Sequence, residues 1–180
     1  MATPVLAFAQ LANEIEKEGL NTKNGERVAA EIAKMFSVKE DEVAIMRLDK
    51  QMLSFIYPAK LATVGSIPAN TSTSLAGRTA TTKRAEILNN FAQSKHASVF
   101  EAVELGGKPK VAGQHPSSDE KLAHVIQKMM SVPVMGPAGV VGVVQVSRKG
   151  KSAPDAGADF TPPDLQKLVT VAASLAKCFK

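Results

Sequence analysis

Residues 131–150 read SVPVMGPAGVVGVVQVSRKG, and residues 158–176 read ADFTPPDLQKLVTVAASLA. Two apolar runs, 129–135 and 140–147, flank the connection Gly-Pro-Ala-Gly, and this pattern predicts a pair of strands joined by a tight turn. The second run is rich in valine and nearly continuous, which is typical of a central strand covered on both faces. This carboxyl-terminal third therefore predicts a pair of strands, the second of them central in the sheet, before a last helix.

The last helix has a well-marked start. Thr161 can act as the N-cap, Pro162 suits the first helical position, and Asp164 places a carboxylate in the first turn. Apolar residues then recur at three- and four-residue spacing: Leu165, Leu168, Ala172, Leu175 and Phe179. The regular stripe predicts an amphipathic helix that can pack along another helix.

Upstream of these elements, apolar spacing predicts helices over 4–17 and 25–36 with a turn at 21–24, and an antiparallel hairpin over 42–49 and 52–57. The segment 59–83 is too long for a plain loop, and we expect a short helix at 74–81 within it. A strand at 84–89, inward packing at 100–103 and a helix at 119–128 complete the prediction. We expect an α/β (α+β) fold with a central antiparallel sheet of about five to six strands and the terminal helices on one face.

This order of elements resembles the GAF domain, a GAF/PAS-like fold. The strand pair at 131–150 is similar to the family's paired strands, and FTPPDL at 160–165 resembles the start of its terminal helix. SLAGRTATTKRAEILNN at 74–90 resembles the family's Leu-Ala-Gly-Arg helix and the strand after it. The resemblance implies a single domain over 1–180, with an N-terminal helix and turn at 1–24 and a core at 25–180.

The resemblance also implies a small-molecule pocket between the sheet and the segment 59–104. The candidate ligand-binding residues are polar and lie along this side of the chain: Tyr57, Ser66, Thr73, Arg78, Asn89 and His96. Arg78 could face an anionic ligand or form a local salt bridge, and the hydroxyls of 71–74 could line the pocket or lead into a helix cap. No particular cofactor is predicted.

The motif that GAF domains use for cyclic nucleotides is degraded in this sequence. Ser147 and Arg148 stand at the family's Asn-Lys pair, and Leu165 replaces its glutamate. Arg148 could pair with Asp164 and tie the loop to the last helix, or Phe160 fills the core and Asp164 serves as a charge at the helix start, which is the interpretation that we prefer.

Cys178 is the one cysteine of the chain, so an internal disulfide and a multi-thiolate metal site are excluded. Thiol-dependent GAF reductases need several cysteines and bilin-linked GAF domains need one in the pocket, so the sequence predicts that the chain is not an enzyme. His96, His115 and His124 lack the spacing of a helical metal pair, and we expect no metal site.

The amino-acid composition bears on whether the chain binds nucleic acid or membranes. The net charge is +5 and the pI near 9.4, but the basic residues are dispersed and aromatic residues make up 4% of the chain, which disfavours nucleic-acid binding. No apolar run approaches the roughly 20 residues of a membrane span, and residues 1–18 do not resemble a secretory leader. These features predict a cytoplasmic protein.

Two functions follow as expectations. The first is a sensory or signalling module that binds a small molecule and acts through dimerisation or a separate partner. The alternative is a dimerisation or protein-interaction module without ligand, in which the first and last helices form a homodimer.

Overall fold

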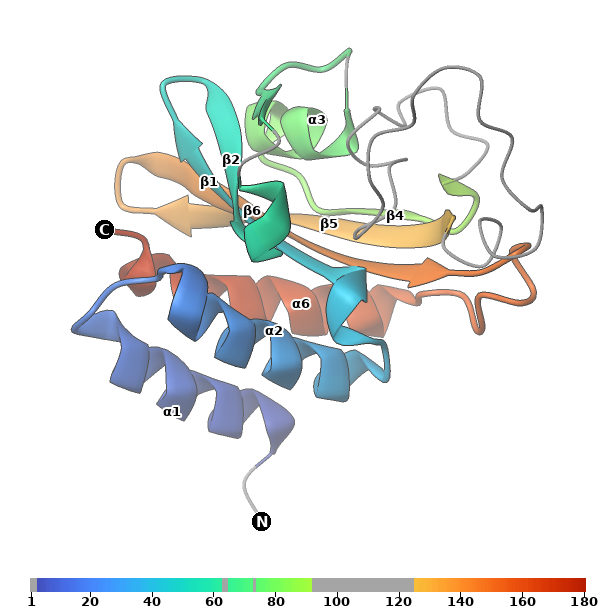
Figure 1. Cartoon of the computed structure of the whole chain (residues 1–180), viewed down its shortest axis with the longest axis horizontal. Coiled ribbons are helices and arrows are strands. Elements are labelled where there is room, and N and C mark those ends of the chain that lie inside the picture. Colours follow the sequence, from blue (N-terminus) through green and yellow to red (C-terminus); the bar gives the residue numbers. More distant parts are fainter. Residues whose placement is uncertain (1–2, 63–64, 73, 92–124) are drawn as a thin grey trace.

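The computed structural model describes residues 3–62, 65–72, 74–91 and 125–180. Its centre is a six-stranded antiparallel sheet with the order β3-β2-β1-β6-β5-β4 (Figure 1). The strands are β1 Val43–Asp49, β2 Met52–Tyr57, β3 Ser66–Pro68, β4 Glu86–Leu88, β5 Ile126–Gly136 and β6 Gly139–Lys149. The helices are α1 Pro4–Glu16, α2 Thr22–Phe36, α3 Leu75–Thr82 and α6 Pro162–Leu175, with short 3-10 turns η1 Glu40–Glu42, η2 Ala59–Leu61 and η4 Ala176–Cys178. The predicted α/β (α+β) class is confirmed.

The valine-rich strand β6 lies at the centre of the sheet beside β1, as its sequence predicted, and β5 lies between β6 and the edge strand β4. Val144 and Val146 face the helical layer, whereas Val143 belongs to the apolar cluster on the opposite face. Because both faces are covered, the strand needs apolar residues at successive positions. The hairpin of β1 and β2 is confirmed as well, and its turn at Lys50 and Gln51 has positive φ at both residues.

One face of the sheet carries the helical layer. α2 and α6 pack against the strands, and α1 lies outside them (Figure 1). Thr161 and Asp164 form the predicted reciprocal cap: the Thr161 amide donates to Asp164 Oδ2 over 2.9 Å, and the Asp164 amide donates to Thr161 Oγ1 over 3.4 Å. The buried stripe of α6 contacts β5 and α1, so the predicted interhelical seam lies within this chain.

The second helix begins earlier than the apolar pattern indicates. The side chain of Asn21 accepts from the Asn24 amide over 3.0 Å, and the side chain of Asn24 accepts from the Asn21 amide over 2.7 Å. This reciprocal cap starts α2 at Thr22, so the turn predicted at 21–24 was wrong, and the boundary expected between 24 and 25 falls inside a helix.

The helix predicted at 119–128 was also wrong where the structure describes it. Ile126 pairs with Lys149 and Lys128 with Arg148, so these residues begin β5. A short apolar run has no clear period of its own, and pairing with a long neighbouring strand decides its conformation. Residues 119–124, like the segment 92–104, lie outside the described residues.

The opposite face of the sheet carries α3, which confirms the short helix expected at 74–81. Its N-cap is Ser74, whose hydroxyl accepts from the Gly77 amide over 2.8 Å. Two apolar clusters lie on this side, one around Met46, Leu53 and Phe55, and one around Leu75 and Phe91. In the described part of the chain, no helix is long and apolar enough to cross a membrane.

Candidate functional site

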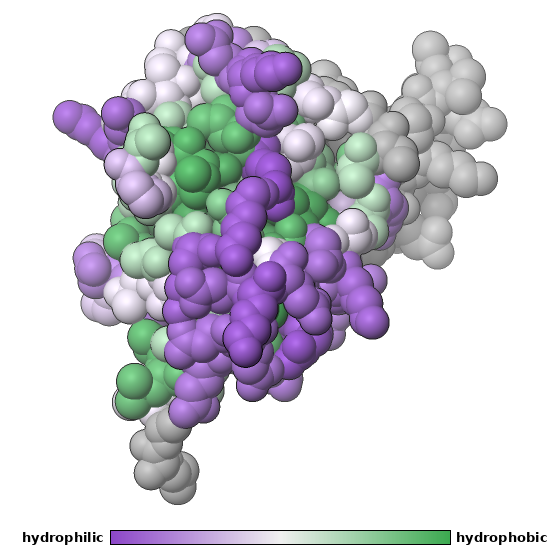
Figure 2. Space-filling model, turned by 90° about the vertical axis from the view of Figure 1, so that its left-hand side faces the viewer, coloured by the Kyte–Doolittle hydropathy of each residue, from purple (hydrophilic) through white to green (hydrophobic). Residues whose placement is uncertain are grey.

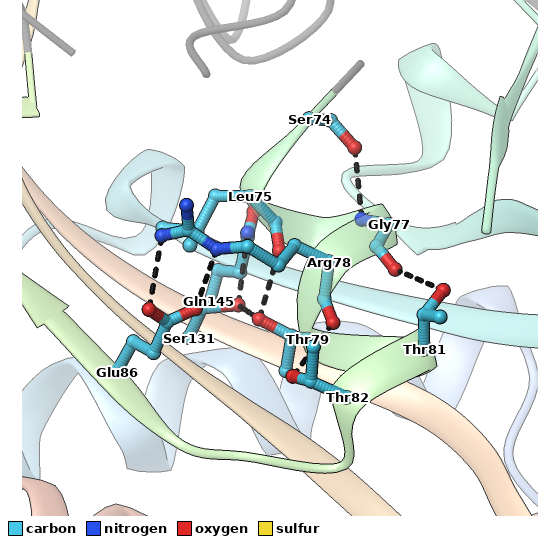
Figure 3. A network of polar contacts seen from close by, with 10 residues as sticks. All are labelled: Ser74, Leu75, Gly77, Arg78, Thr79, Thr81, Thr82, Glu86, Ser131 and Gln145. Atoms are coloured by element: carbon cyan, nitrogen blue, oxygen red, sulfur yellow. Dashed lines mark hydrogen bonds and ion pairs between the residues drawn. The ribbon is translucent and has the colours of Figure 1, made fainter. Parts of the chain in front are cut away.

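A row of side chains crosses four neighbouring strands on the α3 face of the sheet. Ala44 of β1 is paired with Gln145 of β6, Gln145 with Ser131 of β5, and Ser131 with Glu86 of β4. Directly paired residues of antiparallel strands point to the same face. Three polar side chains therefore lie side by side beneath α3 (Figure 3). We call Gln145, Ser131 and Glu86, together with Arg78 and Thr79 of α3, the polar row.

The inner end of the polar row is a continuous chain of neutral hydrogen bonds. Gln145 Nε2 donates to Ser131 Oγ over 3.1 Å, Ser131 Oγ and Thr79 Oγ1 are 2.7 Å apart, and Thr79 Oγ1 donates to the Leu75 carbonyl over 2.8 Å. Thr79 has a single hydroxyl proton and gives it to Leu75, so Ser131 must be the donor to Thr79. Thr79 and Ser131 are fully buried and Gln145 is 3% exposed.

The outer end of the polar row is charged. Arg78 Nε and Nη2 donate to the two carboxylate oxygens of Glu86 over 2.8 and 2.9 Å, a bidentate ion pair between α3 and the edge strand β4. The two side chains are 19% and 31% exposed. The polar row therefore has a partly exposed ion pair at its outer end and buried neutral side chains two strands further in.

Gly77 sets the distance between α3 and the chain after β3. A Cβ atom at this position would lie 2.4 Å from the Pro68 carbonyl oxygen and 2.8 Å from that of Asn70. Both neighbours are backbone atoms, which cannot rotate away as a side chain can. Glycine is therefore required for the close approach that holds α3, and with it Arg78 and Thr79, over the sheet.

Of the six predicted ligand-binding residues, Arg78 lies in the polar row. Its side chain forms the local salt bridge that the sequence left as an alternative to an anionic ligand. Asn89 lies just after β4 and holds the backbone of Phe160: it accepts from the Phe160 amide over 2.9 Å and donates to its carbonyl over 3.1 Å. Thr73 and His96 lie outside the described residues.

Tyr57 and Ser66 lie away from the row. Tyr57 ends β2 and packs against the cluster of the helical layer. Burial raises the pKa of its phenol, and the carboxylates of Glu40, Asp41 and Glu26 raise it further, so the hydroxyl is neutral at physiological pH. Ser66 is exposed on the edge strand β3, opposite Ser54.

Four residues of the polar row were missed by the sequence analysis: Thr79, Glu86, Ser131 and Gln145. One signal was available, because a glutamine inside the valine run of β6 is unusual for a strand buried on both faces. The other members of the polar row come from three other elements, α3, β4 and β5, so their convergence is a property of the tertiary fold.

Of the two interpretations of Arg148, Phe160 and Asp164, the preferred one is confirmed: Phe160 is 3% exposed in the core and Asp164 lies in the first turn of α6, so the alternative pairing of Arg148 with Asp164 is not formed. Arg148 donates to the Phe36 carbonyl over 3.2 Å and lies over the Phe160 ring at 4.8 Å, whereas Asp164 caps α6. Arg148 thereby links the end of α2 to the segment before α6, which is a structural contact in the helical half of the molecule.

Cys178 lies on the other side of the sheet from the polar row. It is fully buried in the helical-layer cluster, and its thiol donates to the Ala12 carbonyl over 3.3 Å. Burial raises the pKa of this thiol. Among the described residues no group of three or more metal-binding side chains comes together, and His96, His115 and His124 lie outside them.

A surface depression of about 560 Å³ lies at the end of α2, apart from the polar row. None of the six predicted ligand-binding residues lines this depression. Its lining consists of Ala30, Ala33, Lys34, Ser37, Val38, Lys39, Glu40 and Asp41.

Comparison with known proteins relates the fold to solved structures. No family model matches the sequence, and no curated protein matches it. The GAF domain of an Acinetobacter phosphoenolpyruvate-protein phosphotransferase superposes with a TM-score of 0.64 at 17% identity, covering 99% of this chain and 94% of that one. The GAF domain of a two-component sensor histidine kinase from Bacillus halodurans gives 0.50 at 15% identity, covering 76% and 79%.

An enzyme is among the similar structures as well. The free methionine-R-sulfoxide reductase of Neisseria meningitidis, solved with its substrate, gives a TM-score of 0.59 at 13% identity and covers 99% of this chain and 92% of that one. This match corrects the prediction that the chain is not an enzyme, because the same fold carries catalysis. At these identities the comparisons establish the architecture, and the chain has the GAF domain fold.

Proposed function

We propose that this chain is a sensory or signalling module of the GAF type that binds a small polar molecule on the α3 face of its sheet. The observation that carries the proposal is the polar row. Thr79, Ser131 and Gln145 are 0–3% exposed at an interface that apolar clusters surround on both sides. A few convergent polar groups within an apolar lining are typical of small-molecule sites.

The position of the row suits a signalling role. Ser131 and Gln145 belong to the neighbouring interior strands β5 and β6, and the adjacent residues of these strands, Val132 and Val144, face the helical layer. A molecule that alters the hydrogen bonds of the row would shift strands that also support α6. The similar structures favour the same reading, since one comes from a sensor kinase and another contains a bound substrate.

Ser131→Ala tests this function, with Ser147→Ala as its matched control. Both serines are almost fully buried, Ser131 on β5 and Ser147 on β6, but Ser147 donates to the Glu42 carbonyl outside the row. Each substitution removes one buried hydroxyl and is expected to cost about 1–3 kcal/mol of stability. S131A also leaves Gln145 and Thr79 without their shared partner.

The measurement is native mass spectrometry of the purified chain, followed by a thermal-shift screen of polar metabolites. We expect wild type and S147A to retain or bind a small molecule and S131A to lose it. Equal binding by S131A and S147A, or no binding by wild type, would contradict the proposal.

The second candidate is the predicted homodimer, and one observation favours it. α1 is the outermost helix, and Leu6 on it is 57% exposed. Figure 2 shows apolar surface low on this side of the molecule, below a charged area. We propose that a second copy packs against this face of α1, while the inner faces of α1 and α6 hold the fold together.

Leu6→Glu should convert the dimer to a monomer, because a carboxylate cannot be desolvated at an apolar helix contact without a partner. Light scattering measures the mass of wild type and variant at the same concentration. A monomeric wild type, or an L6E dimer of unchanged mass, would reject this candidate. The cytoplasmic location remains a prediction from the sequence, and it is compatible with both proposed functions.

A further inference from the structure

An apolar surface lies on the α3 side of the sheet, at the end where the β1–β2 and β5–β6 hairpins turn (Figure 1). Met135 is 45% exposed there and is paired with Val140. Val140 and Leu48 are partly buried and pack against the cluster around Met46. Pro133, two residues before Met135 on β5, is also partly exposed. We call Leu48, Pro133, Met135 and Val140 the hairpin patch.

The hairpin patch continues the buried cluster of the α3 face to the surface of the molecule. Figure 2 views this end of the molecule and shows apolar surface in its upper half, with hydrophilic groups on either side. Contiguous apolar surface with a polar rim marks a site of interaction with another molecule.

Three basic side chains flank the hairpin patch. Lys50 lies in the turn between β1 and β2, Lys83 is the C-cap of α3, and Arg84 follows it. All three are exposed. Among the residues that the structure describes, none of the three forms an ion pair. They are therefore available to carboxylates of another molecule.

The register of β4 places Arg84 beside the patch. Glu86 is paired with Ser131 on the α3 face, whereas Ala85 packs against the cluster of the helical layer. Because successive side chains of an extended segment alternate between faces, Arg84 returns to the α3 face. It lies two residues beyond Glu86, toward Pro133, which is two residues beyond Ser131.

The two lysines occupy backbone conformations that favour other residues. Lys50 has φ 48° in its turn, and Lys83 has φ 59° at the end of α3. Glycine and asparagine adopt this left-handed region with the least strain and are preferred at such turn and cap positions. The chain thus places a lysine at each margin of the hairpin patch at a cost in stability, and strain of this kind accumulates at functional positions.

We infer that the hairpin patch docks a partner protein that presents apolar side chains flanked by carboxylates. The apolar side chains would cover Met135 and Val140, and the carboxylates would pair with the basic flank. A second copy of this chain is disfavoured, because a symmetric contact through the patch brings the same cations of both copies together. Nucleic acid is disfavoured because the patch has no aromatic side chain on which a base could stack.

The test selects peptides from a random library, displayed on phage, against the full chain. We expect the selected peptides to share leucine, isoleucine or phenylalanine flanked by aspartate or glutamate. Fluorescence anisotropy with synthetic copies of these peptides then gives their dissociation constants. The affinity should fall as salt is added, because salt screens the exposed ion pairs at the rim.

Met135→Glu and Met52→Glu form a matched pair of variants. Both methionines are exposed, 45% and 39%, but Leu53 belongs to the cluster of the α3 face, so Met52 before it points to the other face. M135E places a carboxylate in the hairpin patch and should weaken peptide binding at least about tenfold. M52E should leave it unchanged.

Lys50→Gly combined with Lys83→Gly separates recognition from folding. Glycine relieves the left-handed strain, so the double variant should unfold at the wild-type temperature or above it. The loss of two charges should nevertheless weaken peptide binding at least about tenfold. Ser37→Gly is the control, because Ser37 has φ 54° at the C-cap of α2 and should leave binding unchanged.

Selected peptides without an excess of acidic residues would overturn the inference, and so would a library that yields no binding peptide. Equal binding by M135E and M52E, or a double glycine variant that binds like wild type, would overturn it as well. Phosphatidylserine vesicles are the remaining probe. If they bind wild type but not M135E while no peptide binds, the patch is a membrane contact and the protein partner is rejected.

Discussion

Gly77→Ala should destabilise the fold by about 2–3 kcal/mol, although alanine is the better helix former. The new Cβ would lie 2.4 and 2.8 Å from the carbonyl oxygens of Pro68 and Asn70. To relieve this steric overlap, α3 or the chain after β3 must shift, and either shift disturbs the contacts of Arg78 and Thr79. Urea unfolding followed by circular dichroism gives the free energy of unfolding.

Gly25→Ala is the matched control, because Gly25 also lies in the first turns of a helix. Its Cβ would meet Ile56 Cγ2 at 3.3 Å, a side-chain atom that can give way. Alanine is favoured over glycine in a helix by about 1 kcal/mol, so G25A should be neutral or stabilising. If the two variants change stability equally, the close approach of α3 is not what Gly77 provides.

Phe8→Ala should cost about 3–5 kcal/mol, the range for deleting a buried aromatic side chain. Phe8 is 1% exposed and belongs to the cluster that joins α1, α2, α6 and the sheet. The substitution leaves a cavity between α1 and the rest of the helical layer. Thermal or urea unfolding measures the loss.

Leu6→Ala on the same helix provides the comparison. Leu6 is 57% exposed, so its truncation should change stability by no more than about 0.5 kcal/mol. A large difference between F8A and L6A would establish α1 as an integral part of the domain. If both variants unfold like wild type, α1 contributes little, and the fold is completed by the helices behind it.

The parts of the fold that the sequence predicted are those with local signals. The start of α6 is one, since Thr161, Pro162 and Asp164 lie within four residues of one another. The hairpin of β5 and β6 is another, because a glycine-containing turn separates two apolar runs. The start of α2 was missed, since an asparagine at N3 completes a cap that usually carries glutamate or glutamine.

The candidate site was harder to predict because its contacts are long-range. Thr79 and Ser131 are separated by 52 residues, and Asn89 holds Phe160 from 71 residues away. The six predicted residues lie between positions 57 and 96, where the resemblance implied a pocket. The fold instead brings Ser131 and Gln145 together on the interior strands β5 and β6, and only strand register shows that they are neighbours.

The hydrogen-bond chain from Gln145 to the Leu75 carbonyl has one consequence for what can occupy its inner end. The carbonyl can only accept, so every proton along the chain points toward α3, and the hydroxyls cannot turn round separately. At the Gln145 end, Ser131 therefore presents a lone pair, and the side-chain amide of Gln145 is the donor that meets it. An amide is suited to this position, whereas a carboxylate would meet another acceptor. The helix contact at one end thus sets the polarity of the chemical group that is accepted at the other.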